Sequence, residues 1–130
     1  MSIRVAVLTT GRSDYGLLYP LLERLHTDPR FELSLLVTGA PLANDDGVTM
    51  REIRADGFPI AAELPLESGR DRLATARAVA TAVSGIAGAL DALAPDILVL
   101  LGDRFETLAG AEAALILGIP IAHLHGGEVT

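Results

Sequence analysis

The sequence predicts an α/β fold, a three-layer α/β/α Rossmann-like parallel sheet. Three observations lead to this prediction. Runs of Ile, Leu and Val alternate with helical patterns along the chain, and polar, glycine-containing segments follow several of the runs. The runs are nearly continuous, as expected of strands buried on both faces. Strands that alternate with helices favour right-handed crossovers and a parallel sheet with helices on both sides.

The apolar runs define the expected strands, which in chain order are 3–9, 31–38, 59–64, 96–101 and 120–124. Helical spacing of apolar residues defines the expected helices, which are 17–26, 50–56, 71–93 and 105–117. In the long helix the expected apolar stripe is formed by Leu73, Ala76, Ala80, Val83, Ala87, Leu90 and Leu93 or their neighbours.

Start and stop signals support these helices. Pro20 fits the first turn of a helix that begins near Gly16, because first-turn N–H groups have no intrahelical partner. The segment 49–52 has the pattern of a capping box, and Gly57 and Gly118 follow helices as C-terminal stops. Pro95 is expected to end the long helix.

The five strands suit the order 3-2-1-4-5. Ligands of such sheets bind at the carboxyl ends of strands where the order reverses, here between the first and fourth strands. Polar segments follow the first, fourth and fifth strands, at 11–16, 102–106 and 123–128. These strands are neighbours in the expected order, so their loops should converge on one crevice.

Composition limits the function. The chain has 130 residues, the size of one domain, and a net charge of −7 without a basic cluster, which argues against nucleic-acid and anionic membrane partners. All ten basic residues are Arg, so no Lys is present for Schiff-base chemistry. There is no Cys, we identify no signal peptide and no membrane-spanning stretch, and a cytoplasmic location is expected.

The first polar segment is not a dinucleotide fingerprint, because Arg12 stands near where a second glycine would be needed. A guanidinium beside a helix N-terminus favours a phosphate or another anion. The alternative is that Arg12 pairs with Asp14 as local structure.

The second polar segment places Asp103 directly after a buried strand. A carboxylate at that edge can exchange a proton with a substrate. The alternative is an N-cap for the following helix, a common role for Asp. Arg104 and Glu106 are either surface charges or a pair that orients Asp103.

The third polar segment holds two histidines on one side of a strand. His123 is expected to be buried and hydrogen-bonded, whereas His125 lies at the strand end as a candidate for proton exchange. Gly126 and Gly127 permit a tight turn or a close ligand approach, and Glu128 is placed to orient His125 or bind a hydroxyl. A metal site is disfavoured, because the segment has no Cys or third His.

Together these segments give the chain its family resemblance. It resembles the N-terminal part of the hydrolysing UDP-N-acetylglucosamine 2-epimerases, which supply sugars for sialic-acid-type biosynthesis. Ser13 departs from the family's usual Ala. The matching stretches are 10–16, 37–39, 56–58, 102–106 and 123–128.

The resemblance implies one half of a GT-B-type enzyme of two Rossmann-like domains. Residues 1–130 would be the N-terminal domain, and a C-terminal nucleotide-binding domain would lie outside the chain, which alone should be inactive. The implied reaction removes the C2 proton of a UDP-sugar as UDP leaves C1, and water then adds to the 2-acetamidoglucal. It needs no nicotinamide, metal or other cofactor. The implied partners are the UDP-sugar, the second domain and, as an open possibility, further copies of the chain.

The resemblance also assigns roles to residues. Asp103 matches an acid–base carboxylate, and His125 stands where the family has Glu or His. The substrate-binding candidates are Arg12, near the phosphates, together with Asp14, Gly126, Gly127 and Glu128. Which group takes the C2 proton, and whether the sugar is N-acetylglucosamine or a 2,4-diacetamido relative, stays open.

Two other functions fit the same fold. A GT-B glycosyltransferase N-domain would keep Arg12 and the glycine-rich turn but would not need Asp103 and His125 together. A non-catalytic doubly wound binding module is also compatible, because fold does not fix function.

Overall fold

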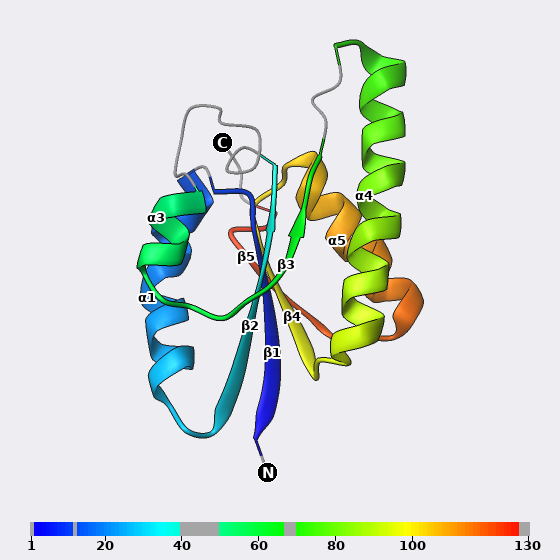
Figure 1. The fold of residues 1–130 in the computed structure, drawn as a ribbon. Helices are drawn as coiled ribbons and strands as arrows, with labels where there is room; N and C mark the ends of the chain where they lie inside the picture. The colour runs from blue at the N-terminus through cyan, green and yellow to red at the C-terminus, as the bar shows by residue number, and fades with distance from the viewer. Residues whose placement is uncertain (1, 12, 40–49, 67–69, 128–130) are drawn as a thin grey trace.

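The computed structural model describes residues 2–11, 13–39, 50–66 and 70–127. All five strands pair in parallel in the order β3-β2-β1-β4-β5, which confirms the predicted sheet (Figure 1). In order along the chain the strands are β1 (Ile3–Thr9), β2 (Phe31–Thr38), β3 (Ile60–Leu64), β4 (Ile97–Leu101) and β5 (Ile121–Leu124). The helices are α1 (Ser13–Thr27), α3 (Met50–Ala55), α4 (Arg72–Leu93) and α5 (Phe105–Leu117).

The helices form two outer layers around the sheet. In Figure 1, α1 and α3 lie on one face and α4 and α5 on the other. Strand β1 contributes to both cores: Val5 and Val7 pack with α1, whereas Ala6 and Leu8 pack with α4 and α5. Both sets of side chains are buried, which explains why this strand has a continuous apolar run.

Helix α1 begins earlier than the sequence predicts. It starts at Ser13, so Pro20 lies inside the helix and not in its first turn. Proline removes the hydrogen bond to the carbonyl four residues before it, which is that of Gly16. Gly16 is exposed and has no side chain, so water can reach that carbonyl. The helix therefore tolerates a proline that was expected to mark its start.

The expected apolar stripe of α4 is correct only in its C-terminal half. Asp71 is the N-cap, and Ala82, Ile86 and Leu90 are the buried residues of the helix. Leu73 is 60% exposed, in conflict with its predicted place on the core face. The reason is that the first turns of α4 extend beyond the end of the sheet, where no layer covers them (Figure 1).

The helix ends agree with the predicted stop signals. Gly57 and Gly118 have φ of +81° and +74°, the left-handed conformation that glycine adopts without strain. Ala94 takes the same conformation just before Pro95, which confirms the end of α4. Thr49, the first residue of the expected capping box, lies outside the described residues.

By length and composition alone, α4 is able to cross a membrane, although no membrane-spanning stretch was identified in the sequence. Its 22 residues are mostly Ala, Leu, Val and Gly with few charges. This is weak evidence for a span, because the core helix of a globular domain passes the same test. One face of α4 packs in the core with α5.

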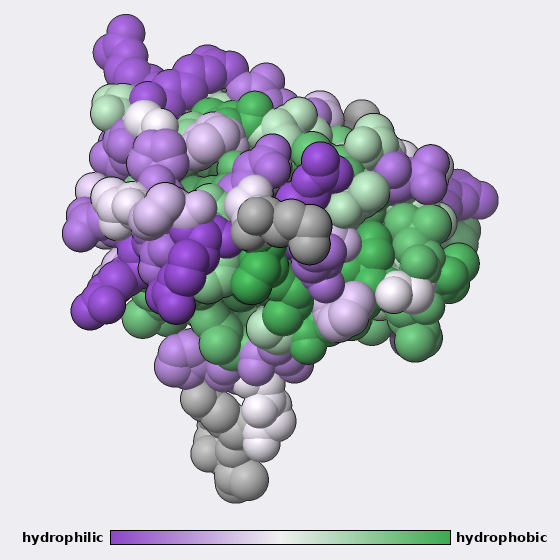
Figure 2. Space-filling model, turned by 90° about the horizontal axis from the view of Figure 1, so that it is seen from below, coloured by the Kyte–Doolittle hydropathy of each residue, from purple (hydrophilic) through white to green (hydrophobic). Residues whose placement is uncertain are grey.

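Large apolar side chains are exposed at the end of α5. Leu115 and Ile116 are 77% and 78% exposed. Figure 2 shows the molecule from below, with hydrophobic residues gathered on the α5 side and hydrophilic residues on the opposite side. Single exposed leucines are common on protein surfaces, whereas several large apolar side chains exposed together are less usual.

Candidate functional site

The carboxyl ends of β1, β4 and β5 are adjacent, as the sequence predicts. Strand β1 pairs with β4 through Val5–Ile97 to Val7–Val99, and β4 pairs with β5 up to Leu101–Leu124. Because all strands are parallel, the segments that follow them meet at one edge of the sheet. The switch of strand order between β1 and β4 lies in the middle of this edge.

The turn from β1 into α1 is organised by Asp14. Its carboxylate accepts hydrogen bonds from Thr9 Oγ1 (3.0 Å), the Thr10 backbone N–H (2.9 Å) and Thr10 Oγ1 (2.8 Å). Asp14 is only 5% exposed. Its carboxylate therefore already binds three donors of its own turn, and its role toward a substrate stays a prediction. Arg12, the other candidate of this segment, lies outside the described residues.

Asp103 is exposed in the bend between β4 and α5. The N-cap of α5 is Arg104, which makes no capping hydrogen bond, so the alternative role of Asp103 as the cap is not the one it has here. Within the part of the chain that the structure describes, the Asp103 carboxylate makes no hydrogen bond or ion pair. The position of the Asp103 side chain is therefore set by the backbone of the bend and not by side-chain contacts.

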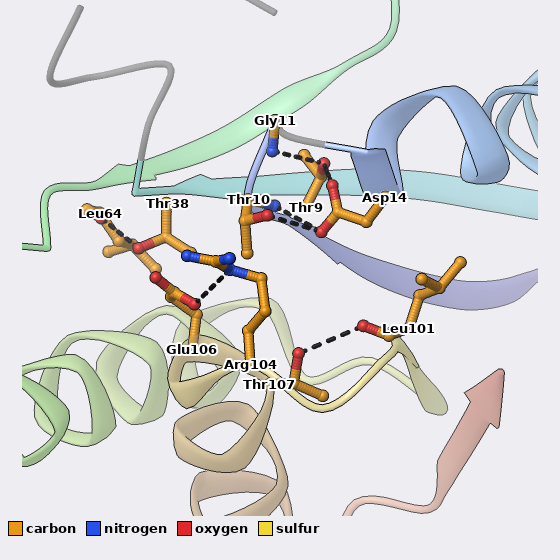
Figure 3. A network of polar contacts seen from close by, with 10 residues as sticks. All are labelled: Thr9, Thr10, Gly11, Asp14, Thr38, Leu64, Leu101, Arg104, Glu106 and Thr107. Atoms are coloured by element: carbon orange, nitrogen blue, oxygen red, sulfur yellow. Dashed lines mark hydrogen bonds and ion pairs between the residues drawn. The ribbon is translucent and has the colours of Figure 1, made fainter. Parts of the chain in front are cut away.

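Arg104 and Glu106 form an ion pair, with 3.2 Å between Arg104 Nε and Glu106 Oε2. The Glu106 side chain is 8% exposed and that of Arg104 46%. In Figure 3 both side chains point from the start of α5 toward Thr10 and Thr38, at the ends of β1 and β2. A buried carboxylate thus fixes a half-exposed guanidinium at this edge of the sheet.

Glu106 lies beside Gly39, the residue that follows β2. A Cβ atom at Gly39 would lie 3.5 Å from Glu106 Oε1 and 3.8 Å from the carbonyl oxygen of Thr10. Gly39 has φ of +83°, which disfavours other residues. The segments after β1, β2 and β4 therefore meet, and the positive φ accounts for the glycine of the 37–39 stretch.

The end of β5 differs in one respect from expectation. His123 is exposed, not buried, although it is hydrogen-bonded as predicted, with 2.7 Å between Nε2 and the carbonyl oxygen of Gly102. The reason is that the side chains of β5 are poorly covered: Ile121 and Leu124 are exposed as well. His125 follows the strand, is exposed, and has φ of +54°, an unusual value for a residue with a side chain.

The two positions after His125 are glycine for different structural reasons. A Cβ atom at Gly126 would lie 2.2 Å from Cε1 of the His123 imidazole, so only glycine allows the turn to pass over that ring. Gly127 has φ of +75° and no atom near its missing side chain. The predicted close approach is therefore made by a side chain of the same chain. Glu128 lies outside the described residues.

One hollow of the structure lies between two helices of the same face of the sheet. A pocket of about 610 Å³ separates the start of α4 from α5, where Phe105 and Leu108 line it. These residues are on a different face of α5 from Glu106, which packs toward β2. Within the described ranges, no three His, Asp or Glu side chains group as a metal ion would need.

Sequence patterns did not identify two features of the site. The hydrogen bonds of Asp14 to Thr9 and Thr10 fix the first turn, and the bond of His123 to Gly102 joins the β4 and β5 ends. The sequence did point to these regions, since the residues lie in or next to the predicted polar segments. Their partners follow only from the three-dimensional structure.

A doubly wound parallel sheet with acidic, basic and imidazole groups at its switch point defines a Rossmann-like domain with a candidate ligand-binding edge. The family model described as UDP-N-acetylglucosamine 2-epimerase matches residues 23–130. The chain therefore belongs to the UDP-N-acetylglucosamine 2-epimerase family.

Relatives agree with this assignment. The chain is 41% identical over 128 residues to the hydrolysing UDP-N,N'-diacetylbacillosamine 2-epimerase of Legionella pneumophila, covering 97% of this chain and 34% of the relative. It is 33% identical to the GDP/UDP-N,N'-diacetylbacillosamine 2-epimerase of Campylobacter jejuni, covering 98% and 33%. The chain thus spans about a third of the length of these relatives.

Solved structures show the same fold. A crystal structure of a UDP-N-acetylglucosamine 2-epimerase superposes with a TM-score of 0.85 at 21% identity, covering 100% of this chain and 35% of that one. The Neisseria meningitidis enzyme bound to UDP-GlcNAc gives 0.80 at 16% identity, covering 98% and 33%. The Rossmann-like fold expected from the sequence is confirmed.

Proposed function

We propose that the full-length protein is a hydrolysing 2-epimerase of UDP-activated 2-acetamido sugars and that residues 1–130 are its N-terminal domain. A base removes the C2 proton while the C1–O bond breaks, and UDP leaves with the bonding electrons. Water then adds across the resulting glycal, with the hydroxyl on C1 and a proton on C2. The products are UDP and the free C2 epimer.

The observation that carries this proposal is the Asp103 carboxylate, exposed at the sheet edge and without a described partner. A group that exchanges a proton with a substrate must be reachable, and both oxygens of this carboxylate are available to a substrate. His125 is the second candidate for proton transfer, at the end of the neighbouring strand. The family membership supplies the reaction class.

The departing diphosphate needs positive charge. We assign this role to Arg104, because Glu106 fixes its guanidinium at the crevice, and to Arg12 from the sequence. A guanidinium matches phosphate geometry and stays protonated. We further propose that the nucleotide is bound mainly by a C-terminal domain, and that the 130-residue chain alone does not turn over the substrate.

For the sugar, the relatives favour a 2,4-diacetamido substrate. The two named for diacetylbacillosamine are 41% and 33% identical, whereas the Neisseria meningitidis UDP-N-acetylglucosamine 2-epimerase is 28% identical. We therefore expect the full-length protein to prefer UDP-N,N'-diacetylbacillosamine over UDP-N-acetylglucosamine.

The test is turnover of both UDP-sugars by the full-length protein in D2O. Deuterium at C2 of the free sugar, together with UDP release, is the expected result. Retention of the original C2 hydrogen contradicts the elimination. The matched variants are Asp103→Asn and Asp91→Asn, the second an exposed carboxylate on α4. Only the first should lose activity, and sugar transfer by Asp103→Asn at the normal rate would instead indicate a glycosyltransferase.

A further inference from the structure

Gly102, the residue before Asp103, is held by strand β5 through both of its backbone polar groups. Its N–H donates to the carbonyl oxygen of Leu124 at 2.9 Å. Its carbonyl oxygen lies 2.7 Å from Nε2 of His123. Because a carbonyl oxygen only accepts, Nε2 must carry the hydrogen in this bond. Gly102 has φ of +85°, so this turn has a conformation that few other residues would adopt.

The exposed imidazole of His123 packs against its own turn at Gly126. The missing side chain of Gly126 leaves the space that the ring occupies, since a Cβ there would lie 2.2 to 2.8 Å from Cε1, Nδ1 and Nε2. Real Cβ atoms do not approach so closely. Any larger residue at 126 would displace the ring from Gly102 or the turn from the ring.

These contacts act on Asp103 through one peptide group. The carbonyl that accepts from His123 belongs to the peptide plane shared by Gly102 and Asp103. Fixing that plane holds one of the two peptide groups that flank the Asp103 Cα atom, and so limits the directions in which the side chain leaves the backbone. No side-chain contact within the described ranges does so instead.

We propose that His123 is a positioning residue for Asp103, acting through the Gly102 carbonyl, and that Gly126 is the glycine that makes this possible. The inference rests on the proposed function, since it needs Asp103 to take part in the reaction. Small displacements of a reacting group cost large factors in rate, so the hydrogen bond matters more for turnover than for stability.

The test uses paired variants in the full-length protein. The amide nitrogen of Gln is able to take the place of Nε2, whereas that of Asn is able to take only the place of Nδ1. His123→Ala and His123→Asn should lower kcat by about 10- to 100-fold with KM changed by less than about threefold. His123→Gln should recover most of the loss. His26→Ala, on the far end of α1, is the control and should leave kcat unchanged.

Gly126 supplies a second, independent measurement. Gly126→Ala should lower kcat in the wild-type background by a factor similar to that of His123→Ala. In the His123→Ala background the same substitution should have little effect, because the ring it displaces is gone. Equal factors in both backgrounds would overturn the proposed contact between Gly126 and His123.

The outcomes separate the two proposals. Normal kcat in His123→Ala alongside an inactive Asp103→Asn overturns the positioning role and leaves the proposed function standing. Normal kcat in Asp103→Asn overturns the role of Asp103 itself. Thermal melting checks that the variants fold. A loss of kcat in His123→Ala that merely follows a lowered melting temperature, without rescue by Gln, would also overturn the proposal.

Discussion

The Tyr15 hydroxyl donates a hydrogen bond of 2.5 Å to the Asp56 carboxylate and so joins α1 to the turn that follows α3. Tyr15 is 4% exposed and stands in the first turns of α1, directly after the residues that organise the crevice. The bond links the 10–16 and 56–58 stretches, two of the segments that carry the family resemblance. It also gives the folded state a defined pH dependence.

Burial, and then the neighbouring Asp56, raises the pKa of Tyr15 above its ordinary value of 10.0. The folded state therefore holds this proton more tightly than the unfolded state. Its contribution is complete below about pH 10 and is lost as the pH rises further. Tyr15→Phe should cost about 1 kcal/mol at pH 7. This cost should shrink above pH 10.

Urea unfolding at pH 7, 10 and 11 measures the effect. Tyr19→Phe, which removes the hydroxyl of the neighbouring aromatic ring, is the control. A difference between wild type and Tyr15→Phe that is constant across this range would contradict the prediction.

Asp14 is expected to be needed for folding, because its carboxylate accepts from donors buried at the end of β1. Asp14→Ala leaves the Thr10 N–H without a partner and should cost about 3 kcal/mol of unfolding free energy. Asp14→Asn keeps one acceptor and should cost less. Chemical denaturation of the two variants gives the values. Unchanged stability with a raised KM for the UDP-sugar would favour substrate binding instead.

Gly88 and Gly110 both lie inside helices, and the same substitution should have opposite effects on them. A Cβ at Gly88 meets nothing within 4 Å, so Gly88→Ala should stabilise the chain by about 1 kcal/mol through helix propensity. A Cβ at Gly110 would lie 3.0 Å from Cδ2 of both Leu8 and Leu100, which are buried. Overpacking there should outweigh the propensity gain and destabilise by about 1 kcal/mol. Melting curves showing shifts of the same sign would refute this account.

The left-handed backbone of His125 predicts a conflict between stability and activity. A residue with a Cβ pays about 1 to 2 kcal/mol in this conformation, which glycine avoids. His125→Gly should therefore be about 1 kcal/mol more stable than His125→Ala, which also lacks the imidazole but retains the Cβ. Both should be less active in the full-length protein. Equal stability of the two variants would show that the backbone relaxes at no cost.

The fold was predictable because it follows from patterns along the chain. The apolar runs predicted the bounds of β1 and β2 as they occur, helical spacing predicted those of α5, and alternation of strands with helices predicted the strand order. The start of α1 was missed because the Asp14 carboxylate, and not a local pattern, fixes that turn. Leu73 was misplaced because periodicity does not tell how far a helix extends past its sheet.

The candidate site was predictable as a set of segments but not as a set of contacts. Parallel strands bring their ends together, so the meeting of the 102–106 and 123–127 segments followed from the strand order. The bond between His123 and Gly102 depends on a ring orientation that a neighbouring glycine permits, and no spacing in the sequence encodes it.

Among the described strands, β5 is four residues long and pairs with β4 alone, whereas β1 is paired on both sides. A strand held along one side opens at a lower free energy than a central one. His123 and His125 therefore belong to a unit of lower local stability than the turn built on β1. Hydrogen exchange would divide the crevice into a firmly protected half around Asp14 and a half at β5 whose amides exchange first. In the 130-residue chain, the same opening that exposes those amides would release Gly102, so the direction of Asp103 depends there on the pairing of this short strand.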